Sequence, residues 1–176
     1  SKDGTWKIIE DLHKKNPAFI GLKLARNSGH QKALWAGLMF AKDKADISIS
    51  IDADLQDDIN AFNNFIEEYD KGAQIVFGVR SKRETDTFFK RNTALLFYKL
   101  MQILGVNLIY NHADYRLMSK PALKALSQYE ESNLFIRAIV TNIGFKTAIA
   151  YYDRSSRIAG TSKYPLKKML AFLKGL

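Results

Sequence analysis

The sequence predicts one α/β domain with a mostly parallel sheet and helices on its faces. Short runs rich in β-branched and aromatic residues alternate with segments of helical periodicity, which is typical of parallel strands joined through helices. The 176 residues are 47% hydrophobic and 26% charged, enough apolar sequence for one substantial core. We therefore expect a single domain of mixed structure.

The first half of the chain shows the alternation most clearly. It opens with a turn at Ser1 to Thr5 that leads into a helix with no strand before it, so we expect the chain to begin inside its own fold. Predicted strands at 19–24, 47–51 and 74–79 are then separated by predicted helices at 30–41 and 60–69.

The second half is less regular. Its periodicity predicts a long amphipathic helix at 88–104, shorter helices at 121–126 and 134–142, and strands at 116–119 and 146–152. The most apolar stretch, 93–110, is interrupted by Lys99, Gln102, Gly105 and Asn107 and does not predict a membrane span.

Composition narrows the classes of function. With no cysteine, the chain has neither a disulfide framework nor thiolate metal ligands, and it fits a reducing compartment such as the cytosol. A net charge of +9 suits an anionic partner such as a phosphorylated substrate, an acidic lipid or nucleic acid. We do not expect nucleic acid, because no basic stripe is interleaved with aromatic residues outside the predicted core.

Polar oxygen ligands cluster directly after the predicted strand 47–51. In open parallel sheets, ligands bind at the carboxyl ends of strands, and alternate residues of an extended chain face the same way. Asp52, Asp54 and the amide of Gln56 could therefore converge on one hard cation, for which Mg²⁺ or Mn²⁺ fits best. A bare Asp-x-Asp pattern is a weak indication by itself, so its strand-end position carries the interpretation.

The next two carboxylates have a simpler explanation. Asp57 and Asp58 precede a predicted helix, whose N-terminal dipole attracts negative charge, so we expect a solvated helix start. A calcium EF-hand loop is a poor alternative, because Asp57 stands where the glycine should be and Asn63 where the bidentate glutamate should be.

Three segments together resemble the family 2 glycosyltransferases that charge polyprenyl phosphates, such as dolichyl-phosphate mannose synthases and bactoprenol glucosyltransferases. They are LARNSGHQKALWAGL at 24–38, SIDADLQD at 50–57 and ADYRLMS at 113–119. The resemblance implies a GT-A, Rossmann-like fold whose first strand is missing here. It also implies a UDP- or GDP-linked sugar donor, Mg²⁺ or Mn²⁺, and inverting transfer to a polyprenyl phosphate in cell-envelope or glycan biosynthesis.

The resemblance also implies roles for individual residues. Asp52 would approach the donor or the metal, and Asp54 with Gln56 would hold the metal against the diphosphate. The turn before the helix at 30–41 could meet a donor anion, whereas for His30 we expect a structural or surface role. The remaining binding candidates are Arg26 and Asn27 for the donor, and Arg80, Arg91, Arg157, Ser162 and Lys163 for the phosphates.

Asp114 matches the catalytic base proposed for the family. A lipid phosphate has a second pKa near 6, with phosphorylated side chains as the guide, so it is mostly ionised at neutral pH without a base. We therefore also expect that Asp114 could position the acceptor. A third alternative is a structural role, as a helix cap or as the buried partner of Arg116.

The end of the chain predicts a basic amphipathic helix. We expect a catalytic domain at 1–164 and a basic amphipathic helix at 165–176, with an apolar stripe of Leu166, Met169, Leu170 and Leu173 beside lysines. Such a helix could lie on the cytoplasmic face of a membrane, or it could dock on the core.

Two other classes of function stay open at this point. Phosphatases of the haloacid dehalogenase type also place Asp-x-Asp after a buried strand, but they need a further acidic pair that the sequence does not clearly supply. A noncatalytic membrane-surface module would use the +9 charge alone. The sequence also leaves a homo-oligomer open.

Overall fold

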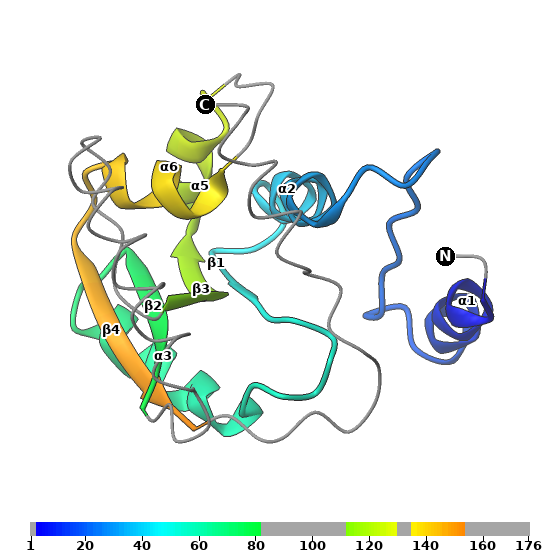
Figure 1. The fold of residues 1–176 in the computed structure, drawn as a ribbon, viewed down its shortest axis with the longest axis horizontal. Helices are drawn as coiled ribbons and strands as arrows, with labels where there is room; N and C mark the ends of the chain where they lie inside the picture. Colours follow the sequence, from blue (N-terminus) through cyan, green and yellow to red (C-terminus); the bar gives the residue numbers. More distant parts are fainter. Residues whose placement is uncertain (1–2, 82–111, 130–134, 154–176) are drawn as a thin grey trace, which may run out of the picture.

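The computed structural model describes residues 3–81, 112–129 and 135–153 (Figure 1). Its helices are α1 Thr5–Lys15, α2 His30–Ala41, α3 Phe62–Asp70, α5 Lys120–Leu126 and α6 Ile136–Asn142, with a short 3₁₀ helix η1 Ile59–Ala61. Its strands are β1 Ile47–Ser50, β2 Ile75–Arg80, β3 His112–Ser119 and β4 Thr147–Tyr152. The predicted helix at 88–104 lies outside the described residues.

The strands form one sheet in the order β1-β3-β2-β4. Strand β3 pairs antiparallel with β1 and β2, and β4 pairs parallel with β2, so β1, β2 and β4 all run in one direction. This confirms an α/β fold in which most strands are parallel. The alternation in sequence did not predict the reversed strand β3 between β1 and β2, because strand order depends on pairing between segments far apart in the chain.

The core lies on both faces of this sheet. Ile75, Phe77 and Met118 pack on one face with buried residues of α2, α5 and α6, whereas Val76 and Leu117 pack on the other face with α3. Successive strand residues point to opposite faces. Consequently Asp114 and Arg116, which share their parity with Met118 on β3, face α2 and α6, the helices that supply their polar partners.

The predicted strand at 19–24 is wrong. The segment forms no strand in the structure, and Phe19 and Ile20 are 51% and 56% exposed. Strand β1 is hydrogen-bonded to β3 and lies at an edge of the described sheet, and the chain between α1 and α2 runs apart from it (Figure 1). The segment instead approaches α1, because a Cβ added at Gly21 would meet Ile9 at 2.5 Å. A β-rich run becomes a strand only where its backbone groups find a neighbouring strand.

The other elements predicted for the described part of the chain are confirmed within a few residues. Strand β3 begins earlier than expected, so that Asp114 lies within it and not before it. None of the helices in the described ranges is long and apolar enough to cross a bilayer.

Candidate active site

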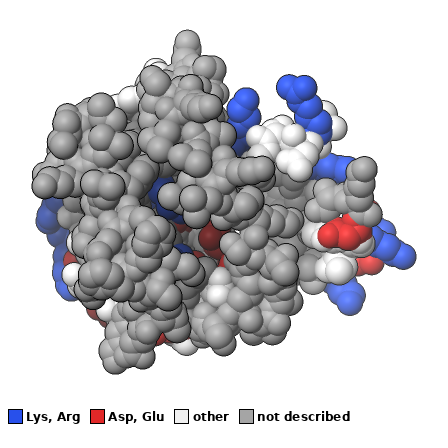
Figure 2. Space-filling model, viewed as in Figure 1, with Lys and Arg blue, Asp and Glu red and all other residues white. Residues whose placement is uncertain are grey.

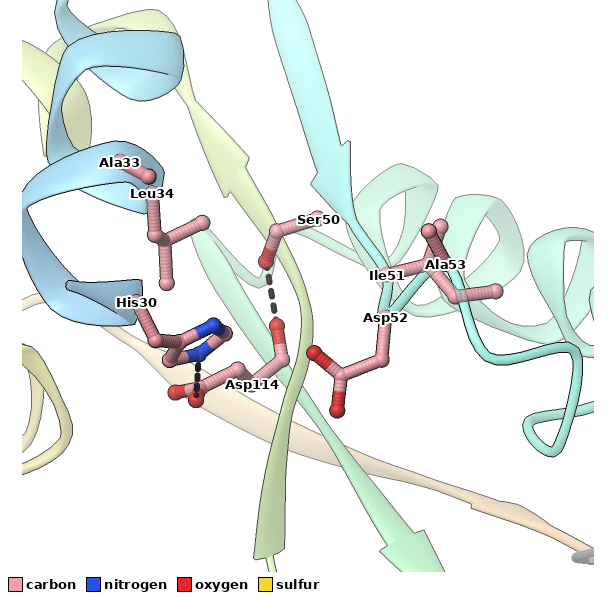
Figure 3. Close-up of a pocket in the computed structure, with 8 residues that line it drawn as sticks. All are labelled: His30, Ala33, Leu34, Ser50, Ile51, Asp52, Ala53 and Asp114. Atoms are coloured by element: carbon pink, nitrogen blue, oxygen red, sulfur yellow. Dashed lines mark hydrogen bonds and ion pairs between the residues drawn. The ribbon is translucent and has the colours of Figure 1, made fainter. Parts of the chain in front are cut away.

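A pocket of about 190 Å³ lies at the carboxyl end of β1 (Figure 3). Asp52 from the loop after β1, Asp114 from β3 and His30 from the start of α2 line it together, and the Asp114 carboxylate points toward the His30 imidazole. Its lining residues are His30, Ala33, Leu34, Ser50, Ile51, Asp52, Ala53 and Asp114. The structure therefore brings together two of the carboxylates that the sequence singled out.

The loop after β1 carries Asp52, Asp54 and Gln56, and its strand-end position is as predicted. Asp52 is half-buried, and burial raises its pKa, as do the negative charges of Asp114, Asp57 and Asp54. Asp54 accepts a hydrogen bond at 3.2 Å from the backbone N–H of Gln56, which is itself buried. The loop thus gathers several carboxylates, and their mutual repulsion adds to the effect of burial on Asp52.

This charge and these atoms fit a divalent cation. The described residues contain no group of three His, Cys, Asp or Glu side chains that could hold a metal ion. Magnesium, however, is commonly held by one or two carboxylates together with substrate phosphates and water. Carboxylate and amide oxygens are ligands of this kind, and of the three predicted ligands Asp52 lines the pocket.

Asp57 is not the solvated carboxylate that the sequence predicted. It is buried, accepts a hydrogen bond from the Tyr152 hydroxyl at 2.9 Å, and lies 3.9 Å from the Arg80 guanidinium. The sequence misplaced it because both partners come from strands that only the fold brings to this loop. The prediction for Asp58 is confirmed, since it caps η1 by accepting from the Asn60 backbone N–H at 2.9 Å.

The other predicted binding residues lie away from the pocket lining or outside the described ranges. Arg80 also donates from Nε to the Tyr152 hydroxyl at 3.3 Å. Arg26 and Asn27 lie in an exposed loop, where the Asn27 side chain accepts from the Gly29 backbone N–H at 3.1 Å. Arg91, Arg157, Ser162 and Lys163 lie outside the described residues.

Asp114 is the most heavily bonded side chain of the site and is 3% exposed. Arg116 donates to its Oδ1, and Arg137 spans both oxygens, from Nε to Oδ1 and from Nη2 to Oδ2, each at 3.1 Å. His30 Nε2 lies 2.8 Å from Oδ2, and the Gln31 amide is 3.5 Å from the same oxygen. One carboxylate therefore joins α2, β3 and α6.

These contacts keep Asp114 ionised. Burial alone would raise its pKa, but hydrogen bonds from His30 and Arg137 and the charge of Arg116 hold it well below its usual range. The same hydrogen bond raises the pKa of His30. A carboxylate held in this way accepts protons poorly.

The sequence did not predict the contacts of His30 and Arg137 with Asp114. His30, for which we expected a structural or surface role, is 46% exposed, and its Nε2 lies 2.8 Å from the Asp114 carboxylate at the pocket. Arg137 was not singled out, although a charged residue inside the apolar run Leu134 to Val140 was a usable indication. Gln31 ties the same helices together by accepting from the Ile136 backbone N–H at 3.3 Å.

Comparison with known proteins agrees with this geometry. A family model described as Glycosyl transferase family 2 matches residues 1–127. The chain is 59% identical over 172 residues, 98% of its length and 51% of the relative's, to the uncharacterized glycosyltransferase YkoT of Bacillus subtilis. It is 41% identical over 165 residues, 93% of its length, to a prophage bactoprenol glucosyl transferase homolog of Escherichia coli. It is 40% identical over 165 residues to the bactoprenol glucosyl transferase of Shigella phage SfV.

The chain spans about half the length of the curated relatives it matches. The family match covers the carboxylate loop, Asp114 and Arg116, and it disfavours the phosphatase and the noncatalytic membrane module. The chain belongs to glycosyl transferase family 2.

Proposed function

We propose that the chain is the catalytic part of an inverting glycosyltransferase that moves a sugar from a nucleotide-diphosphate sugar to a polyprenyl phosphate. The observation that carries the proposal is the pocket at the end of β1 that Asp52 and Asp114 line together, in a family 2 chain. The names of relatives that align over 93% of this chain support the lipid acceptor.

In this proposal the loop after β1 binds the donor. Asp52, Asp54 and Gln56 would hold Mg²⁺ or Mn²⁺, which when bound offsets the charge that develops on the leaving nucleoside diphosphate. Asp52 suits this role because its carboxylate is half-buried beside other carboxylates. The Asp57 contacts with Tyr152 and Arg80 fix the far end of the same loop.

Asp114 organises the acceptor side of the pocket. Its two oxygens are occupied by hydrogen bonds from His30, Arg116 and Arg137, and its pKa lies well below the usual range, so it is a poor proton acceptor. An acceptor phosphate that is mostly ionised at neutral pH does not need one. We therefore assign Asp114 to positioning and not to general base catalysis.

The net charge of +9 suits work beside an anionic membrane. Lys7, Lys14 and Lys15 of α1 and Lys23 of the following loop are exposed, and Figure 2 shows basic side chains interspersed with acidic ones on the described surface. Polybasic surfaces are attracted to anionic lipid leaflets. We infer that the enzyme works at the cytoplasmic face of the membrane, where the predicted helix at 165–176 would add to the contact.

A thermal-shift panel tests the proposal. The chain and a full-length relative such as YkoT would be melted with UDP, GDP and their sugar conjugates, with and without Mn²⁺. Ligand at about a hundred times its Kd should stabilise the folded state by about 2.7 kcal/mol. We expect one base to raise the Tm only with the metal, and the full-length protein to transfer that sugar to a short-chain polyprenyl phosphate. No response to any nucleotide and no transfer would overturn the proposal.

A further inference from the structure

Three basic side chains converge on the single carboxylate of Asp114. One carboxylate is bonded by the guanidinium groups of Arg116 and Arg137 and by the imidazole of His30. A single buried carboxylate needs only one such partner to be neutralised. Two guanidinium groups therefore converge on one carboxylate that lines the pocket, and a second anion could share them.

The two arginines differ in their freedom to change partners. The Arg116 side chain is fully buried on β3, whereas that of Arg137 on α6 is 37% exposed. Moving Arg116 away from Asp114 would leave a buried charge without compensation. Arg137 is therefore the arginine that can exchange one anion for another.

Such an exchange would leave Asp114 with other hydrogen-bond partners. If Arg137 moved away, Asp114 Oδ1 would still accept a hydrogen bond from Arg116, and Oδ2 would still lie 2.8 Å from His30 Nε2. Arg137 donates to the carboxylate from Nε and Nη2. The same planar edge of a guanidinium can bind a phosphate through two hydrogen bonds. On the Arg137 guanidinium, the Asp114 carboxylate now occupies the edge that a phosphate would bind.

We propose that Arg137 binds a phosphate group of a substrate, and that Asp114 holds its guanidinium ready until that phosphate arrives. The inference rests on the proposed function, in which two anionic phosphates approach each other and a cation between them makes the approach tolerable. The phosphate could belong to the lipid acceptor or to the donor diphosphate. The experiment distinguishes these two sources.

The test measures equilibrium binding, which does not depend on turnover. The chain and its variants would be titrated by calorimetry, in one arm with UDP and Mn²⁺ and in the other with a short-chain polyprenyl phosphate. We expect Arg137→Gln to weaken binding in one arm by about tenfold or more, as for the loss of a charged hydrogen-bond pair. Arg137→Lys should recover part of the loss, because it keeps the charge but not the fork.

Lys124→Gln is the matched control, since it removes one positive charge from the exposed face of the neighbouring helix α5. It should leave both arms unchanged. Loss in the lipid arm alone would assign Arg137 to the acceptor, and loss in the UDP arm alone would assign it to the donor.

A purely structural Arg137 would behave differently. Arg137→Gln would then lower the Tm, but the folded variant would bind both ligands like the original chain, and this result would overturn the inference. An equal loss of binding in the Lys124→Gln variant would also overturn it. If the full-length relative shows no sugar transfer although Arg137→Gln weakens binding, the proposed function fails and the phosphate site stands.

Discussion

The hydroxyl of Tyr152, at the end of β4, donates a hydrogen bond at 2.9 Å to the carboxylate of Asp57, which lies three residues after Asp54. Both side chains are buried, and the Arg80 guanidinium at the end of β2 approaches the same carboxylate. The loop that carries the proposed metal ligands is thus tied to the parallel strand pair β2 and β4. Burial also raises the pKa of Tyr152 to about 12, so it remains a donor at neutral pH.

Removing this hydrogen bond should loosen the loop. Tyr152→Phe keeps the ring, whose centroid lies 4.9 Å from that of Tyr115, but removes one hydrogen bond to the buried Asp57 carboxylate, which should cost about 1–3 kcal/mol in the free energy of unfolding. We expect weaker Mn²⁺-dependent UDP binding as well. Urea unfolding and calorimetry would measure both effects.

Tyr151→Phe is the control, because Tyr151 is the neighbouring strand residue and is 62% exposed. It should change neither quantity. Equal behaviour of the two variants would contradict a role for the Tyr152 contact.

Asp54→Asn should remove metal-dependent donor binding and leave the fold intact. Asp54 is partly buried and contacts the loop backbone through one oxygen, and an amide would keep that contact while losing the charge that a divalent cation requires. UDP titrations with and without Mn²⁺ would show the change, with the exposed Asp43→Asn as a matched loss of charge. A folded Asp54→Asn variant with unchanged Mn²⁺-dependent UDP binding would contradict the assignment of Asp54 as a metal ligand.

The pH profile of Asp114→Asn separates positioning from base catalysis. If Asp114 were an obligatory base, transfer by the variant should recover as pH rises and the lipid phosphate loses its remaining proton unaided. We expect the defect to persist from about pH 6 to 9, because the original carboxylate is held ionised and its loss is a loss of geometry.

That variant also needs a stability control. Arg116 is fully buried against Asp114, so removing the carboxylate charge should destabilise the fold by about 3 kcal/mol. Rates are therefore compared below the measured Tm of the variant and with donor binding checked separately. Rates near those of the original enzyme at every pH would refute both roles.

His30 should titrate above its ordinary pKa of about 6.5, because its ring is hydrogen-bonded to the Asp114 carboxylate. Since the folded value is the higher one, the contribution to stability is fully present below the unfolded pKa and is lost as pH rises through the folded pKa. Imidazole NMR shifts against pH would give the folded value, and His30→Gln should remove that part of the pH dependence of unfolding. A midpoint at or below the ordinary value would contradict the contact.

Ending the chain before Pro165 tests the predicted membrane helix. The truncated chain should bind anionic vesicles more weakly than the whole chain, and added salt should mimic the loss. Neutral vesicles provide the baseline. Equal binding by both chains would mean that residues 165–176 do not contact the membrane.

Local pattern was enough for much of the fold and for part of the site. Periodicity placed α2 at His30–Ala41 and β1 at Ile47–Ser50, and it put Asp52 and Asp54 beyond the end of a strand. These features depend on residues within one or two turns or pleats of each other, so the sequence alone determined them. The motifs likewise indicated the family that the comparisons confirmed.

The tertiary structure decided everything that depends on distant partners. The 19–24 run has the composition of a strand but no neighbour to pair with, Asp57 has two buried partners from β2 and β4, and β3 runs against its neighbours. Asp114 meets His30, 84 positions away, and Arg137, 23 positions away. A carboxylate's pKa and reactivity depend on the charges within a few ångströms, and only the folded chain determines which charges those are.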